Sequence, residues 1–165
     1  MSVTDDLLEN ARAYGVAFDK GGLPMPPGLH IAIVACMDAR LNPYGLLGLA
    51  EGDAHVIRNA GGVITDDEVR SLVISQRLLG TREIILIHHT DCGMLTFKND
   101  DLKSRLKHET QVMASSPETF HAFSDPQENV REQIQKVKSH PWIPKGIPVR
   151  GFVYDVKTGR LNEVV

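Results

Sequence analysis

The sequence contains only two cysteines among its 165 residues, Cys36 and Cys92. A small domain stabilised by disulfides would need several pairs, so this chain must rely on a hydrophobic core, and 42% of its residues are hydrophobic. In a reducing compartment such a pair is more often structural, catalytic or metal-binding than cross-linked. A Cys36–Cys92 disulfide therefore remains a minor alternative.

Long apolar runs and a strong net charge are also absent. The longest apolar runs, such as IAIVAC and IILI, are far shorter than the roughly 20 residues of a membrane helix. The first residues, MSVTDDLLENARAYG, are acidic and unlike a secretory signal. A net charge of −3 without a basic run argues against nucleic-acid binding. We expect a cytoplasmic protein that binds neither nucleic acid nor a membrane.

Apolar segments alternate with helical patterns along the first half of the chain. Residues 30–35, 54–58 and 83–88 read as strands. The first is nearly continuously apolar and the third is apolar along its interior, as in a parallel sheet covered on both faces. Asn42-Pro43 starts a helix between the first two strands, and the capping box from Thr65 to Glu68 starts another before the third. This alternation predicts an α/β fold with helices flanking a mainly parallel sheet.

The remaining segments complete a single domain covering residues 1–165. Further helices are expected at 99–112 and 126–140, capped by Asn99 and Asp125, with a loop between them. The segment from residue 149 to the end reads as a strand, a turn and a returning strand. We predict the strand order 2-1-3-4, numbered along the chain, with an antiparallel edge strand.

The N-terminal segment should form a helical arm at about residues 4–20, with Thr4 as its cap and Gly21 and Gly22 after its end. We expect this arm to lie against a neighbouring subunit. Its apolar residues and the exposed edges of the sheet predict a homodimer or a dimer of dimers.

Three potential metal ligands lie at the ends of two predicted strands. Cys36 ends the first strand, and His89 and Cys92 follow the third. In an order 2-1-3 these two strands are neighbours, and ligands bind beyond the carboxyl ends of parallel strands. Two thiolates and one imidazole suit zinc, and three protein ligands with an open fourth place indicate a catalytic rather than a structural site. We therefore predict one zinc ion per chain.

Asp38 and Arg40 lie two and four residues after Cys36, on the loop that leaves the first strand. Such a pair is more often a solvated ion pair, but a nearby metal gives it a function. The Asp38 carboxylate would accept a hydrogen bond from a zinc-bound hydroxide and be fixed by the Arg40 guanidinium. Asp38 is also a conditional fourth metal ligand, in a closed state of the site.

The segments C36-M-D-A-R40, G52-D-A-H-V-I-R-N-A-G61 and H89-T-D-C-G93 resemble those of the β-class carbonic anhydrases, in order and in spacing. The short N-terminus is similar to that of the compact bacterial branch. The resemblance implies that Cys36, His89 and Cys92 bind zinc, and that a zinc-bound hydroxide hydrates carbon dioxide reversibly to bicarbonate. It also implies dimers or multiples of dimers, with the active-site pocket at the subunit boundary.

The sequence also suggests a substrate pocket with a narrow apolar wall that suits carbon dioxide. We assign to it Ala60, Gly61, Gly62, Val63 and Gly93.

Several positions depart from the family pattern. Ala50 replaces a glutamine of plant-type members, Met37 and Ala39 replace two serines, and His88 replaces a frequent glycine. We interpret His88 as a packed core histidine, with a proton relay as the alternative. Arg58 and Asn59 are expected to have a structural hydrogen-bonding role.

Two other functions compete with carbon dioxide hydration. The same scaffold and nucleophile would also serve hydrolysis of carbonyl sulfide or carbon disulfide, which are linear analogues of carbon dioxide. A non-catalytic zinc-binding module would instead have a closed site with four ligands, and the Asp38–Arg40 pair argues against it.

Overall fold

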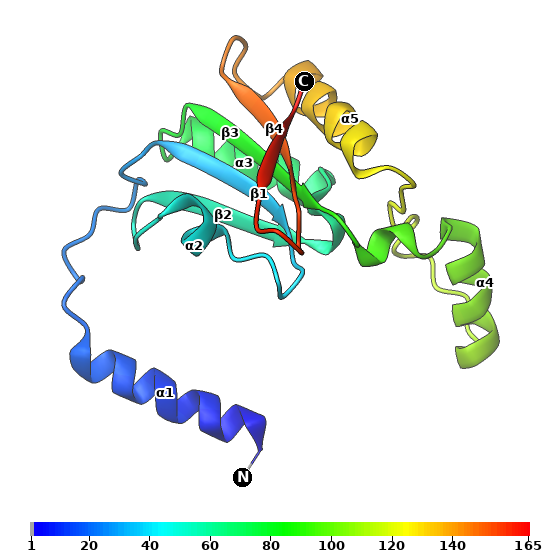
Figure 1. The fold of residues 1–165 in the computed structure, drawn as a ribbon, viewed down its shortest axis with the longest axis horizontal. Coiled ribbons are helices and arrows are strands. Elements are labelled where there is room, and N and C mark those ends of the chain that lie inside the picture. The colour runs from blue at the N-terminus through cyan, green and yellow to red at the C-terminus, as the bar shows by residue number, and fades with distance from the viewer. Residues whose placement is uncertain (1) are drawn as a thin grey trace.

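A five-stranded sheet forms the centre of the computed structural model, which describes residues 2–165 (Figure 1). The sheet has the order β2-β1-β3-β4-β5; β1 to β4 are parallel, and β5 runs antiparallel to β4. Its strands are β1 (Ile31–Cys36), β2 (Ala54–Asn59), β3 (Glu83–His89), β4 (Val149–Tyr154) and β5 (Leu161–Val164). The predicted α/β class, strand order and antiparallel edge are confirmed.

Helices connect the strands and extend beyond the sheet. They are α1 (Val3–Ala17), α2 (Pro43–Leu47), α3 (Asp66–Arg77), α4 (Asn99–Thr110) and α5 (Pro126–Ser139), with short 3₁₀ turns η1 (Ala60–Gly62) and η2 (Gly93–Leu95). Within residues 2–165, none of these helices combines the length and the apolar character that crossing a bilayer requires.

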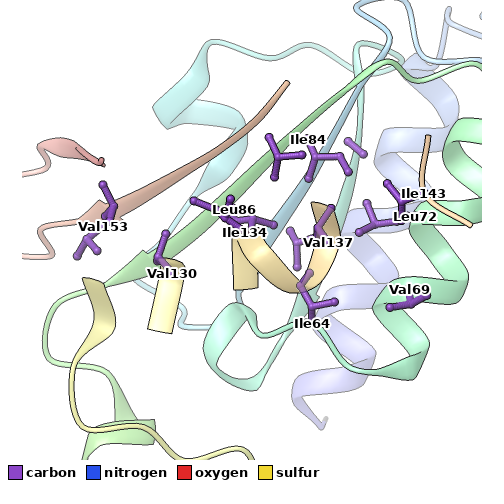
Figure 2. Packing of buried hydrophobic residues seen from close by; sticks show 14 residues of the cluster. Ile64, Val69, Leu72, Ile84, Leu86, Val130, Ile134, Val137, Ile143 and Val153 are labelled. Atoms are coloured by element: carbon purple, nitrogen blue, oxygen red, sulfur yellow. The ribbon is translucent and has the colours of Figure 1, made fainter. Parts of the chain in front are cut away.

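The sheet is covered on both faces because alternate residues of its central strands point to opposite sides. In β1, Ala32 and Val34 belong to the cluster that includes α3 and α5, whereas Ile33 and Ala35 belong to the cluster beside α2 and η2. Figure 2 shows the first cluster, in which side chains of α3 and α5 pack against those of β3 and β4. Each fully buried aliphatic side chain contributes about 1.5–3 kcal/mol, so both faces stabilise the sheet.

Three of the predicted helix starts are confirmed. Asn42 accepts a hydrogen bond from the Gly45 amide at the start of α2, and Thr65 forms the predicted capping box with Glu68. Asp125 caps α5 by accepting hydrogen bonds from the first amides of that helix.

Two predicted caps are wrong. Helix α1 is capped by Ser2 rather than Thr4, because Ser2 and Asp5 form a reciprocal capping box two residues earlier. Asn99 lies inside α4, and its side chain instead accepts hydrogen bonds from the amides of Phe120 and Ala122. A contact with a distant loop therefore takes precedence over local capping.

Helices α1 and α4 extend away from the sheet (Figure 1), and neither contains a buried residue. In α1 the exposed side chains include Leu7, Leu8 and Tyr14. The arm is joined to the rest of the chain by contacts of Tyr14 and Lys20 with Glu51. An apolar helix face without a partner in its own chain thus remains exposed.

Candidate metal centre

The carboxyl ends of β1 and β3 bring the three predicted metal ligands together. Cys36 is the last residue of β1, His89 is the last residue of β3, and these strands are parallel neighbours. Cys92 lies immediately before η2. The three side chains are only 1–4% exposed.

The distances among these ligand atoms fit zinc. Cys36 Sγ lies 4.0 Å from Cys92 Sγ and 3.2 Å from His89 Nε2, and all three atoms lie within 4.8 Å of one another. Bonds of about 2.3 Å to sulfur and 2.0–2.1 Å to nitrogen at tetrahedral angles would give separations of about 3.8 and 3.6 Å. Both cysteines are free thiols, so the geometry favours a metal site over the disulfide alternative.

Hydrogen bonds prepare two of the ligands for a metal. His89 Nδ1 lies 2.8 Å from the Thr90 carbonyl oxygen. Because a carbonyl oxygen can only accept a hydrogen bond, Nδ1 must carry the proton and be the donor. This tautomer leaves the Nε2 lone pair for a metal. Cys36 Sγ accepts a hydrogen bond from the Gly61 amide at 3.3 Å.

The two thiols differ in acidity. Hydrogen bonding from Cys92 lowers the pKa of Cys36 to about 4, with further contributions from His89 and backbone amides that outweigh burial. The pKa of Cys92 is raised, because it is the donor in that contact and is itself buried. Cys36 is therefore the more acidic thiol of this pair.

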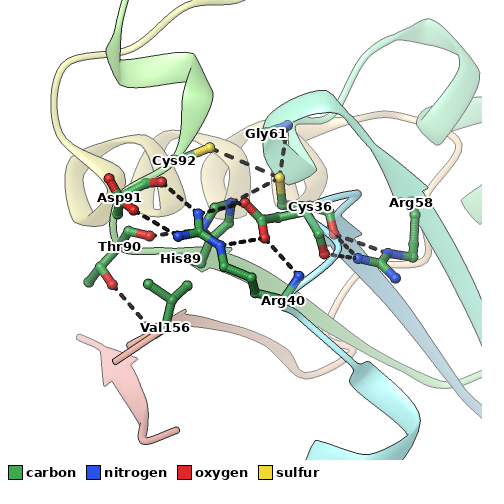
Figure 3. A network of polar contacts seen from close by, with 10 residues as sticks. Cys36, Arg40, Arg58, Gly61, His89, Thr90, Asp91, Cys92 and Val156 are labelled. Carbon is green, nitrogen blue, oxygen red and sulfur yellow. Dashed lines mark hydrogen bonds and ion pairs between the residues drawn. The ribbon is translucent and has the colours of Figure 1, made fainter. Parts of the chain in front are cut away.

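Asp38 lies beside the three ligands and is held by Arg40, which Figure 3 shows next to these ligands. Asp38 Oδ2 is 3.6 Å from His89 Nε2, and the carboxylate accepts two hydrogen bonds from the Arg40 guanidinium, at 2.9 and 2.8 Å. These bonds are the largest cause of the lowered pKa of Asp38, and they also raise the pKa of Arg40. The carboxylate is thus ionised and oriented by its partner.

A second carboxylate, Asp91, lies at this site and was not predicted from the sequence. Asp91 Oδ2 accepts a hydrogen bond from Arg40 Nη1 at 2.7 Å, and the Asp91 carbonyl accepts one from Nη2 at 2.9 Å. The contact with Arg40 also lowers the pKa of Asp91. Its position inside the His-x-x-Cys segment was the available signal, but the spacing alone does not show which way its side chain points.

Arg58 and Asn59 form structural hydrogen bonds around the ligand loop, as expected. Arg58 donates to the carbonyl oxygens of Cys36 and Asp38, at 2.7 and 2.8 Å from its Nη2. The Asn59 side chain donates to the Val63 carbonyl at 2.7 Å.

The residues assigned to the substrate pocket adjoin the metal ligands. Gly61, Gly62 and Val63 are buried, whereas Ala60 and Gly93 are exposed in the single chain. Gly62 packs directly against the backbone of β1 and β3. Their role in binding substrate stays a prediction.

His88 is fully buried at the end of β3. Its Nε2 lies 2.8 Å from the Asn129 side-chain oxygen on α5, and its ring packs on Phe123 at 5.3 Å between centroids. Burial lowers the pKa of His88, so a neutral ring is favoured. These contacts agree with the core interpretation rather than with a proton relay.

The fold and the site together define an α/β protein with a single-metal centre of the Cys₂His type. The sequence model of the family described as carbonic anhydrase matches residues 31–161. This chain belongs to that family, and within it to the β class.

Individual relatives support this assignment. The chain is 59% identical over 165 residues to beta-carbonic anhydrase 1 of Mycobacterium tuberculosis strain H37Rv, covering 99% of each chain. It is 36% identical over 156 residues to a carbon disulfide hydrolase of Acidithiobacillus thiooxidans, covering 84% of this chain and 78% of that protein. The crystal structure of carbonic anhydrase from Streptococcus mutans superposes with a TM-score of 0.93 at 47% identity, covering 100% and 99% of the two chains.

Proposed function

We propose that this protein hydrates carbon dioxide reversibly to bicarbonate and a proton, with one zinc ion per chain bound by Cys36, His89 and Cys92. The observation that carries the proposal is the meeting of these three ligand atoms within 4.8 Å, beside a carboxylate held by Arg40. Two thiolates and one imidazole are a ligand set typical of catalytic zinc, which leaves the fourth coordination place for water or substrate.

When bound, zinc supplies the acidity that makes a hydroxide nucleophile available near neutral pH. Asp38 would accept a hydrogen bond from this nucleophile and so orient it toward carbon dioxide. Arg40 holds the Asp38 carboxylate in that position. If Arg40 released Asp38, the same carboxylate, whose Oδ2 lies 3.6 Å from His89 Nε2, could serve as a fourth ligand and close the site. Backbone around Ala60, Val63 and Gly93 provides the wall against which a small apolar substrate binds.

The test combines metal analysis with stopped-flow hydration of carbon dioxide by protein purified without added zinc. We expect about one zinc per chain, and X-ray absorption distances of about 2.3 Å to sulfur and 2.0–2.1 Å to nitrogen. Replacing both Cys36 and Cys92 by serine should remove zinc and activity together. A zinc content near zero in the active wild-type protein, or zinc retained by the double variant, would contradict the proposal.

Hydrolysis of carbon disulfide or carbonyl sulfide is the second candidate, favoured by the 36% identity to a carbon disulfide hydrolase. The higher identity of 59% is to a beta-carbonic anhydrase, which favours carbon dioxide. A panel of the three gases, assayed on one zinc-loaded preparation, separates the candidates. Turnover of a sulfur analogue at a higher kcat/KM than carbon dioxide would reverse our assignment. A non-catalytic zinc module would turn over none of them.

A homodimer or dimer of dimers is the proposed assembly. Helix α1 has no buried residue, and it exposes Leu7, Leu8 and Tyr14 to solvent. Exposed apolar faces of this kind commonly mark protein contacts. A second copy of the chain would cover this arm and bring a neighbouring surface to the exposed pocket residues Ala60 and Gly93.

A further inference from the structure

Arg40 lies between two carboxylates that belong to different loops (Figure 3). On one side its Nε and Nη2 donate to the two oxygens of Asp38, at 2.9 and 2.8 Å. On the other side Nη1 donates to Asp91 Oδ2 at 2.7 Å, and Nη2 donates to the Asp91 carbonyl at 2.9 Å. The planar guanidinium thus bridges the loop after β1 and the loop after β3.

The ion pair between Arg40 and Asp91 is too exposed to contribute much to the stability of the fold. The Arg40 and Asp91 side chains are 46% and 70% exposed, and ion pairs at such positions add little to folding free energy. Their geometry, however, restricts orientation. A planar guanidinium bound on two edges has a narrow range of rotation, whereas one bound only by Asp38 pivots together with that carboxylate.

The backbone of Asp91 supports this restriction. Asp91 lies between the ligands His89 and Cys92 and adopts a left-handed conformation with φ of 54°. In this conformation both its carboxylate and its carbonyl face Arg40 (Figure 3). The orientation of Arg40 is therefore fixed by hydrogen bonds to the segment that carries the two metal ligands His89 and Cys92.

We propose that Asp91 is a positioning residue for the reaction, which anchors Arg40 in the orientation that keeps Asp38 away from the fourth coordination place. The inference rests on the proposed function, because only a metal at the Cys₂His site gives the position of Asp38 a catalytic consequence. Without Asp91, Arg40 would swing with Asp38, and the closed arrangement would become more populated.

The test compares the cobalt(II)-substituted forms of the wild-type protein, Asp91→Ala and Arg40→Ala at one fixed pH. The visible spectrum reports the ligands of the metal, so Arg40→Ala provides the reference for released Asp38. We expect Asp91→Ala to shift toward that reference, and its zinc form to lose about two- to fivefold in kcat with little change in KM. Asp91→Asn, which keeps an acceptor oxygen, should shift less.

Two comparisons distinguish positioning from a general structural effect. Asp67→Ala removes another exposed carboxylate paired with an arginine, Arg70 at 2.7 Å on α3, and should leave spectrum and kcat unchanged. In the double variant Asp38→Ala/Asp91→Ala the spectral shift caused by losing Asp91 should disappear, because no carboxylate remains to move.

A wild-type spectrum in Asp91→Ala, or a shift that persists without Asp38, would overturn the proposal. If Asp91→Ala does not fold, Asp91→Gly decides by the same readouts, because glycine removes the carboxylate and accepts the φ of 54° at this position. An unchanged spectrum and kcat in that variant overturn the proposal. If the wild-type zinc protein fails to hydrate carbon dioxide, the proposed function is wrong, whereas the cobalt spectra still decide whether Asp91 holds Asp38 away from the metal.

Discussion

Gly62 is the position at which a single added methyl group should disturb both the fold and the metal site. It has φ of 70°, and a Cβ there would lie 2.9 Å from the Cys36 nitrogen, 3.0 Å from the Ile87 oxygen and 3.1 Å from the Ala35 carbonyl carbon. All three are backbone atoms of β1 and β3, which cannot rotate away as a side chain does. One of them belongs to a predicted metal ligand.

The size of the effect follows from two terms. A left-handed conformation costs a non-glycine residue about 1–2 kcal/mol, and forcing a methyl group into a packed core costs about 1–3 kcal/mol. Gly62→Ala should therefore lower the free energy of unfolding by about 2–5 kcal/mol. Displacement of Cys36 should also make the protein lose zinc faster to a chelator.

Urea unfolding of the wild-type protein, Gly62→Ala and Gly159→Ala separates the cost of the left-handed conformation from the cost of the steric overlap. Gly159 has nearly the same φ, 71°, but nothing lies within 4 Å of a Cβ built there. Its alanine variant should show the conformational cost alone, and the entropy effect of alanine on the unfolded chain cancels between the two variants. If Gly62→Ala loses no more stability than Gly159→Ala, the close backbone approach at Gly62 does not limit the fold as we argue.

The hydration rate should rise with pH in the neutral range: Arg40 lowers the pKa of Asp38, so this carboxylate stays ionised and pH acts on the incoming water. In rate–pH profiles, the activity of Arg40→Ala should begin to rise at a higher pH than that of the wild-type protein. Asp38→Ala should bind zinc but be inactive. Wild-type activity in Asp38→Ala would refute this mechanism. Deletion of residues 1–18 should convert the dimer to monomers in sedimentation at micromolar concentration, and a full-length monomer with full activity would contradict the shared pocket. Gly151→Ala should lower the urea midpoint, because its Cβ would lie 2.2 Å from Val130 Cγ1 on α5. The expected loss in free energy of unfolding is about 1–3 kcal/mol. An unchanged midpoint would show that α5 shifts freely.

The strand order and the three metal ligands were predictable because both depend on apolar strand patterns and on the regular geometry of a parallel sheet. The apolar interiors of the strands that end at Cys36 and His89 indicate a sheet covered on both faces, and parallel strands place their carboxyl ends at one edge. The ligand residues therefore had to meet once the two strands were neighbours.

The role of Asp91 was not predictable from spacing, because it depends on one left-handed residue in an irregular loop. The helix caps failed for a similar reason. Ser2 and Thr4 are both good capping residues, and only the reciprocal bond with Asp5 selects Ser2. Asn99 bonds to a loop more than 20 residues away, which no local pattern indicates.

Arg58 would restrict the way in which the site opens and closes in the mechanism that we propose. This residue donates to the carbonyl oxygens of both Cys36 and Asp38, so the backbone that carries the ligand sulfur and the backbone that carries the carboxylate are held by one guanidinium. Asp38 therefore cannot approach the metal by movement of its loop without breaking bonds that also hold Cys36. In the proposed closed state it would reach the fourth coordination place by rotation of its side chain, and the bonds that oppose this rotation come from the guanidinium and the backbone amide of Arg40. The balance between open and closed sites would thus be set by the bonds between Asp38 and Arg40 rather than by flexibility of the loop.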